Sequence, residues 1–109
     1  MTRGEVLYQV QAHGPKELEA EYLKLIKDHV SKLLQLPGFL AAAWFVEEAL
    51  PTDDQFRFIV QYEVETREHL ETYFRTLGVV LRSEAQERFK GQVAILRKIL
   101  IKKEAQFSA

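Results

Sequence analysis

The sequence contains no cysteine, and its 109 residues carry a formal net charge of only −1. Without cysteine the chain can form no disulfide, no thiolate metal site and no cysteine nucleophile. A charge near zero produces no field that would attract nucleic acid or an anionic membrane. These absences exclude disulfide-stabilised, thiolate-metal and strongly basic proteins, and the lack of cysteine suits a cytoplasmic protein.

Long apolar runs are also missing. No stretch of about 18 apolar residues exists, so no membrane-spanning helix is predicted, and the N-terminal residues lack the apolar run of a signal peptide. The chain has no internal repeat, and its length suits one domain covering residues 1–109. We therefore expect a single soluble cytoplasmic domain without a membrane partner.

Two segments alternate between apolar and polar residues, which indicates half-buried strands. In residues 5–12 one face carries Val6, Tyr8, Val10 and Ala12. In residues 55–64 one face carries Phe56, Phe58, Val60, Tyr62 and Val64. Two further segments, 39–50 and 93–102, are apolar on both faces, which predicts strands that are covered on both sides. Residues 51–54 form the predicted turn between the second and third strands.

Helical periodicity follows the first strand and the third. Residues 16–36 follow the break at His13-Gly14-Pro15 and end before Pro37-Gly38, with an inward face made of Leu18, Tyr22, Leu25, Ile26, His29 and Leu33. A second helix, capped by Thr66, carries the apolar stripe Leu70, Tyr73, Phe74, Leu77, Val80 and Leu81. The stripe fails after residue 82, and the capping-box pattern from Ser83 to Gln86 predicts a separate short helix that ends before Gly91.

The predicted order is strand, helix, strand, strand, helix, strand. Right-handed crossovers then give an α+β, ferredoxin-like βαββαβ fold, with a four-stranded antiparallel sheet and helices on one face. The uncovered face carries Leu7 and Ile59 among the long polar residues Gln9, Gln11, Arg57, Gln61 and Glu63. A face that is part apolar and part polar favours a subunit contact, so we predict a homodimer joined through the sheets.

The stretches HVSKLLQLPGF, AAAWFVEE, RFIVQYEV and LRSEAQERFKGQVAILRKIL together resemble the dimeric α/β-barrel superfamily of ferredoxin-like domains. The last stretch is similar to a bacterial domain-of-unknown-function branch, close to the antibiotic-biosynthesis monooxygenase-like proteins. The resemblance implies a fold and a dimer rather than an activity. It also implies a ligand cavity between the sheet and the helices.

His29 is the best candidate for a site residue, because it is a titratable group in the middle of an otherwise apolar helix face. One interpretation is a neutral core histidine with a hydrogen-bond partner. The other is a residue of the implied cavity, which would also be lined by Tyr22, Tyr8, Tyr62 and Trp44. We expect His13 and His69 to be solvated, and Trp44 also fits simple packing in the core or an interface.

No histidine pair has metal-ligand spacing, so neither a metal nor another cofactor is predicted. The resemblance also implies that haem-degrading members of the superfamily carry a constellation of Asn, Trp and His. This chain has no asparagine, so a haem monooxygenase is not predicted. An RNA-recognition domain has the same order of elements and places aromatic residues on its third strand. Here Phe56 and Phe58 are predicted to face the helices, and the basic last strand (Arg97, Lys98, Lys102, Lys103) fits protection of a sheet edge. Nucleic acid is therefore not an expected partner.

Three functions remain open. The first is a homodimeric domain that binds a small apolar or aromatic ligand between the sheet and the helices. The second is a cofactor-independent monooxygenase or isomerase in which His29 acts as the base. The third is a structural or partner-binding dimer without a ligand. No motif in the sequence names a substrate.

Overall fold

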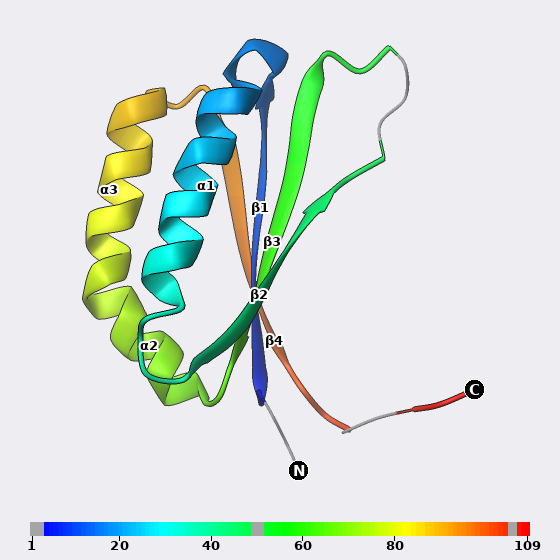
Figure 1. Ribbon diagram of the computed structural model, residues 1–109, viewed down its shortest axis with the longest axis vertical. Coiled ribbons are helices and arrows are strands. Elements are labelled where there is room, and N and C mark those ends of the chain that lie inside the picture. The colour runs from blue at the N-terminus through cyan, green and yellow to red at the C-terminus, as the bar shows by residue number, and fades with distance from the viewer. Residues whose placement is uncertain (1–3, 49–51, 105–106) are drawn as a thin grey trace.

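The computed structural model describes residues 4–48, 52–104 and 107–109. The elements are β1 (Val6–Pro15), a 3-10 turn η1 (Lys16–Leu18), α1 (Glu19–Leu33), β2 (Phe39–Val46), β3 (Gln55–Val64), α2 (Arg67–Arg75), α3 (Leu77–Phe89) and β4 (Ala94–Ile101). All three α-helices lie on one side of the sheet, which Figure 1 shows edge-on. The predicted ferredoxin-like fold is confirmed. Among the described residues, no helix is long and apolar enough to cross a membrane.

The sheet has the order β2-β3-β1-β4, and every neighbouring pair is antiparallel. The predicted inward faces of β1 and β3 are correct, because Tyr8 is paired with Tyr62 and both side chains are buried. The predicted bounds of β3 are also correct. Residues 49–51, which include part of the predicted second strand and the first turn residue, lie outside the described residues.

The core lies between the helices and the sheet and is built largely of aromatic rings. Tyr8 stacks on Tyr62 with ring centroids 5.9 Å apart, and its edge meets Phe74 at 5.3 Å. On α1, Tyr22 stacks on Phe56 at 5.3 Å. Offset and edge-to-face contacts of this kind add to the burial of the rings themselves. The predicted inward face of α1 is confirmed, and its polar face bears an ion pair between Asp28 and Lys32 at 2.9 Å.

The boundary between β1 and α1 differs from the prediction by three residues at the end of the strand. β1 runs through His13 and Gly14 to Pro15, because β3 is long enough to pair with it as far as Gln55. Proline is tolerated there since β4 pairs with β1 only as far as His13, and no neighbouring strand requires the missing N–H. At its other end α1 stops at Leu33, three residues earlier than predicted.

The helical segment after β3 breaks at Thr76 rather than at Ser83, so the predicted position of the break is wrong. Thr66 does cap α2, where its side chain accepts a hydrogen bond from the His69 amide. Gly78 then allows the first turn of α3 to approach α2, because a Cβ at this position would lie 2.7 Å from the Tyr73 carbonyl oxygen. Because α3 has its own axis after this break, Leu81 and Phe89 face inward and are buried. Val80, which was predicted to be buried, is exposed to solvent.

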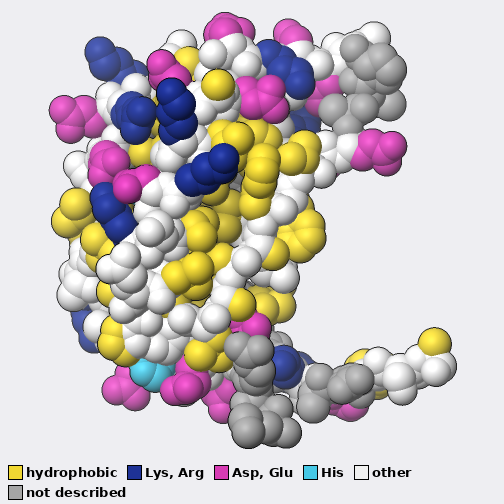
Figure 2. Space-filling model, viewed as in Figure 1, with side chains coloured by type: hydrophobic (Ala, Val, Ile, Leu, Met, Phe, Trp, Pro, Cys, Tyr) yellow, Lys and Arg dark blue, Asp and Glu magenta, His cyan; other side chains and the backbone are white. Residues whose placement is uncertain are grey.

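The sheet face opposite the helices, here called the open face, carries an aligned row of four residues across the strands: Phe45, Ile59, Gln11 and Leu96. Phe45 and Leu96 are about half exposed, at 50% and 53%. β2 and β4 are edge strands, so the predicted cover on both of their faces is not provided by this chain. Figure 2 shows that the side away from the helices is hollowed, with hydrophobic side chains along its rim.

Gly78→Ala tests whether close approach at Gly78 determines where the helix breaks. We expect the free energy of unfolding to fall by about 1–3 kcal/mol, the usual cost of an extra methyl group in a packed site. Urea denaturation measures this change, and Val79→Ala is a neighbouring control on an exposed side chain. A stability equal to that of the wild type would show that the two helices can separate freely.

Candidate functional site

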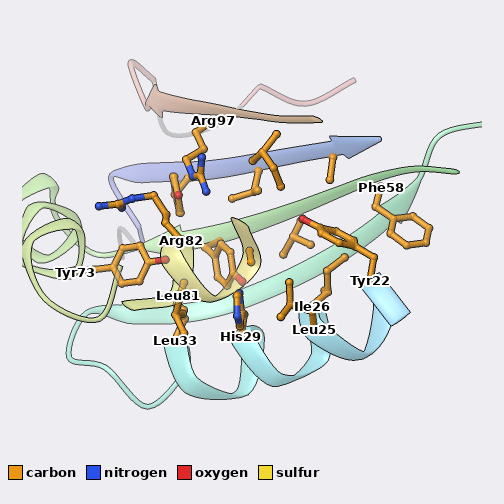
Figure 3. Close-up of a pocket in the computed structure, with 17 residues that line it drawn as sticks. Tyr22, Leu25, Ile26, His29, Leu33, Phe58, Tyr73, Leu81, Arg82 and Arg97 are labelled. Atoms are coloured by element: carbon orange, nitrogen blue, oxygen red, sulfur yellow. The ribbon is translucent and has the colours of Figure 1, made fainter. Parts of the chain in front are cut away.

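A cavity of about 50 Å³ lies between the helices and the centre of the sheet. Its wall includes all four tyrosines of the chain and His29. Two arginines, Arg82 and Arg97, also line it. In Figure 3, Arg82, Arg97 and Tyr73 gather toward one end of the cavity, whereas Tyr22 and Phe58 lie toward the other. This volume is enough for a few water molecules or part of a small ring system.

A wider recess of about 300 Å³ adjoins the cavity beside α3 and β4. The two spaces share five wall residues, Tyr22, Arg82, Ala85, Ile95 and Arg97. Because these residues border both spaces, a ligand in the recess would reach toward the inner cavity. The recess is within the size range of small-molecule sites, which are generally lined by apolar side chains with a few polar groups.

His29 extends from α1 into the cavity wall, as Figure 3 shows. Its side chain is 16% exposed, and its Nε2 atom is buried without a hydrogen-bond partner among the described residues. The nearest carboxylate oxygen, Oε1 of Glu84 on α3, is 3.9 Å from Nε2, which is too long for a hydrogen bond. The interpretation of His29 as a hydrogen-bonded core residue therefore finds no partner at Nε2 among the described residues.

Burial lowers the pKa of His29 below its ordinary value of 6.5, because an imidazolium loses solvation inside the protein. The carboxylates of Glu84 and Asp28 oppose this shift, and the Lys32 ammonium adds to it. The residue is thus a neutral imidazole near pH 7. A neutral ring with a free nitrogen can accept a proton or hydrogen-bond to a ligand.

The four tyrosines have raised pKa values, chiefly because burial disfavours the phenolate. Burial raises the pKa of Tyr22 and of Tyr73 to about 12 each. The positive charges of Arg97 and Arg82 partly oppose the rise at Tyr8 and Tyr73. All four side chains are therefore neutral hydroxyl groups at physiological pH, and each can donate a hydrogen bond.

The structure brings together four of the five predicted site residues, since His29, Tyr22, Tyr8 and Tyr62 all line the cavity. Trp44 does not. It lies on β2, makes an edge-on contact with Phe58 at 5.3 Å and is 43% exposed. Its side chain belongs instead to an apolar seam between α1 and β2, which also contains Leu23, Ile26 and Val30. In Figure 2, hydrophobic side chains gather along this seam.

The other two histidines lie outside the cavity. His13 is exposed, as predicted, and its Nδ1 is 3.0 Å from Oε1 of Gln55. His69 is only partly exposed, because its ring packs over Gly38, where a positive φ of 84° and the adjacent ring both favour glycine.

One group of potential metal ligands occurs in the described part of the chain, although no metal was predicted. Ligand atoms of Asp28, His29 and Glu84 lie within 4.8 Å of one another. Asp28 is, however, already paired with the Lys32 ammonium at 2.9 Å. A trio with one carboxylate occupied in this way does not define a metal centre.

Sequence reasoning missed three polar residues of the cavity wall: Tyr73, Arg82 and Arg97. Tyr73 was placed only in the apolar stripe of its helix. Arg97 and Lys98 are adjacent charges in a strand that is apolar on both faces, so alternation does not indicate which of them faces the helices. The register decides, because Arg97 pairs with the inward-facing Val10 and Lys98 with the outward-facing Gln9.

The chain belongs to the family described as a domain of unknown function, DUF4286, which matches residues 5–103. No curated protein has a significantly similar sequence.

Solved structures with the same fold include antibiotic-biosynthesis monooxygenase-like proteins. A candidate antibiotic biosynthesis monooxygenase from Deinococcus radiodurans has a TM-score of 0.71 and 17% identity, over 95% of this chain and 98% of its own. A mutant of SnoaB, a cofactor-independent oxygenase from Streptomyces nogalater, has a TM-score of 0.70 and 10% identity, over 92% and 95%. A de novo designed protein, Foldit4, has a TM-score of 0.61 and 14% identity, over 90% and 98%. Because a designed protein is among them, this likeness establishes the fold and no activity.

His29→Leu tests the environment of the imidazole. At pH 7.5 we expect the free energy of unfolding to be unchanged or to rise by up to about 1 kcal/mol, because Nε2 gives up no partner. The folded-state pKa lies below 6.5, so the unfolded chain binds more protons as the pH falls through 6.5. Wild-type stability should therefore decline from pH 7 to pH 5 more steeply than that of the variant.

Urea denaturation at several pH values measures both effects. His13→Leu controls for the loss of an exposed histidine. A loss of about 1–3 kcal/mol in His29→Leu at pH 7.5 would instead reveal a hydrogen-bond partner that the fold provides.

Proposed function

We propose that this domain binds a small aromatic or apolar molecule in the cavity and the adjoining recess between the sheet and the helices. The observation that carries the proposal is the buried Nε2 of His29, which has no hydrogen-bond partner among the described residues. The rest of the cavity wall consists of apolar side chains, tyrosines and two arginines. A buried polar atom without a partner costs free energy in the unliganded protein. A ligand that hydrogen-bonds to it would recover that cost.

Aromatic chemistry in the ligand is supported by the side chains around the space. Tyrosine and phenylalanine rings line the inner cavity and the recess, and such rings stack on or meet the edges of other rings. The neutral tyrosine hydroxyls supply a few polar contacts that can orient a bound molecule. This combination of apolar surface with a few convergent polar groups is typical of small-ligand sites.

A second candidate function is a cofactor-independent oxygenase in which His29 acts as the base. Because its pKa is lowered, the imidazole of His29 is unprotonated near pH 7. Its free nitrogen can therefore accept a proton from an acidic ring substrate. The electron-rich anion formed in this way is the species that can react directly with dioxygen. SnoaB, which shares the fold, is a cofactor-independent oxygenase. Oxygen uptake with an electron-rich naphthol would distinguish this activity from binding alone.

We also propose that the protein is a homodimer joined through the open faces of its sheets. Apolar residues on three strands of that face, Phe45, Ile59 and Leu96, are left without cover from the helices. The central polar side chains are partly paired within the chain, because Gln9 donates to Gln61 at 3.1 Å and accepts from Gln11 at 2.8 Å. Such pairing lowers the cost of desolvating a partly apolar face, and the remaining amide groups can hydrogen-bond across a two-fold interface.

Filling the recess should weaken ligand binding. Ala85 on α3 lines both spaces, and Ala85→Leu adds three carbon atoms there. With 2-naphthamide as a neutral aromatic probe, isothermal titration calorimetry should show that the affinity falls by about tenfold or more, as displacement of a ring from its site predicts. The melting temperature should not fall, because the added atoms enter existing space.

Ala20→Leu makes the same change on an exposed position of α1 and is the matched control. It should leave the affinity unaltered. A wild-type protein with no measurable affinity for the probe would oppose the binding proposal and favour a structural or partner-binding role.

Ile59→Asp tests the proposed dimer. Two like charges would enter a desolvated two-fold interface, which should dissociate the dimer. Sedimentation equilibrium at micromolar concentration should give twice the chain mass of 12.7 kDa for the wild type and the chain mass for the variant. Val79→Asp, an exposed apolar position on α3, provides the control and should remain dimeric. A wild-type monomer, or a dimer that tolerates Ile59→Asp, would contradict the proposal.

A further inference from the structure

Two guanidinium groups, those of Arg82 on α3 and Arg97 on β4, line both the inner cavity and the recess beside it. In Figure 3 both side chains lie toward the same end of the cavity, near Tyr73. Their positive charges act on the same tyrosines, since each of them opposes the rise of the pKa of Tyr8 and of Tyr73. The two cations therefore share one environment.

Neither guanidinium has a carboxylate partner within 4.0 Å in the described part of the chain. All sixteen acidic residues of the protein belong to that part, because residues 1–3, 49–51 and 105–106 contain no Asp or Glu. By contrast, Arg57 and Arg67 pair with carboxylates at 3.0 and 3.3 Å. The positive charge at the recess is therefore not neutralised by an ion pair from the chain.

Arg82 is also held in place. Its Nη2 donates to the Phe74 carbonyl oxygen at 3.3 Å, near the C-terminal end of α2. Gly78 leaves room for this arrangement, because a Cβ at that position would lie 3.0 Å from Nη1 of Arg82. One hydrogen bond uses only part of a group with five N–H donors, so Arg82 keeps donors for a ligand.

From this geometry we infer that the ligand carries a carboxylate, and that Arg97 and Arg82 bind it while the ring system occupies the tyrosine-lined space. This inference rests on the proposed binding function and adds the chemical class of the ligand, an aromatic carboxylic acid in its ionised form. A planar guanidinium matches a carboxylate with two parallel hydrogen bonds. Neutral tyrosine hydroxyls beside the arginines can donate further hydrogen bonds to the same oxygens.

The experiment compares two probes that differ in charge but share a ring system, 2-naphthoate and neutral 2-naphthamide. In isothermal titration calorimetry at low salt, the wild type should bind 2-naphthoate at least about tenfold more tightly, as a charge-assisted contact predicts. Arg97→Gln should remove this preference, so that the ratio of the two affinities falls to within about twofold of one, because both probes keep the same ring contacts. Arg97 is exposed on an edge strand, so the change leaves the core intact.

Arg75→Gln is the matched control, since it removes the same charge from an exposed position at the end of α2, outside the cavity wall. It should preserve the preference for 2-naphthoate. Equal weakening by Arg75→Gln and Arg97→Gln would overturn the inference, because net charge alone would then explain the preference. Equal wild-type affinities for the two probes would overturn it while leaving the binding proposal intact. Failure of the wild type to bind either probe would overturn both.

Discussion

β1 and β3 pair in a single register along the centre of the sheet. This register sets Tyr8 against Tyr62 on the face that the helices cover and Gln9 against Gln61 on the opposite face. The side-chain period of a strand is two residues, so a slip of one residue would exchange these faces completely. The aromatic core, the wall of the cavity that the sheet forms and the composition of the open face all follow from this one alignment.

Burial has opposite consequences for the different ionisable groups around the cavity. It lowers the pKa of His29 and raises the pKa of the tyrosines, so all of these side chains are neutral near pH 7. Arginine stays charged in proteins. The space therefore combines neutral hydrogen-bonding groups with two positive charges, Arg82 and Arg97, and this balance favours a ligand that contributes the negative charge itself.

The shape of the fold explains why the two proposals concern opposite sides of one sheet. Three helices cover one face and enclose the cavity, while the open face keeps Ile59 in a row with Phe45 and Leu96. A second copy on the open face would shield these residues without entering the cavity. Proteins with the same fold range from a cofactor-independent oxygenase to a designed protein, so the chemistry must come from the side chains of the cavity and not from the topology.

The order of the elements, the faces of β1, β3 and α1, and the inward position of His29 can all be predicted from the amino-acid sequence. These features follow from local periodicity, because alternation and helical spacing are written in neighbouring residues. Contacts between distant segments decided the rest. The helix breaks at Thr76, next to the close approach of Gly78 to α2, and Arg97 faces the cavity because β4 pairs with β1 in one register. The lack of a hydrogen-bond partner for His29 Nε2 among the described residues and the position of Trp44 outside the cavity likewise depend on which elements pack together. No local pattern records that information.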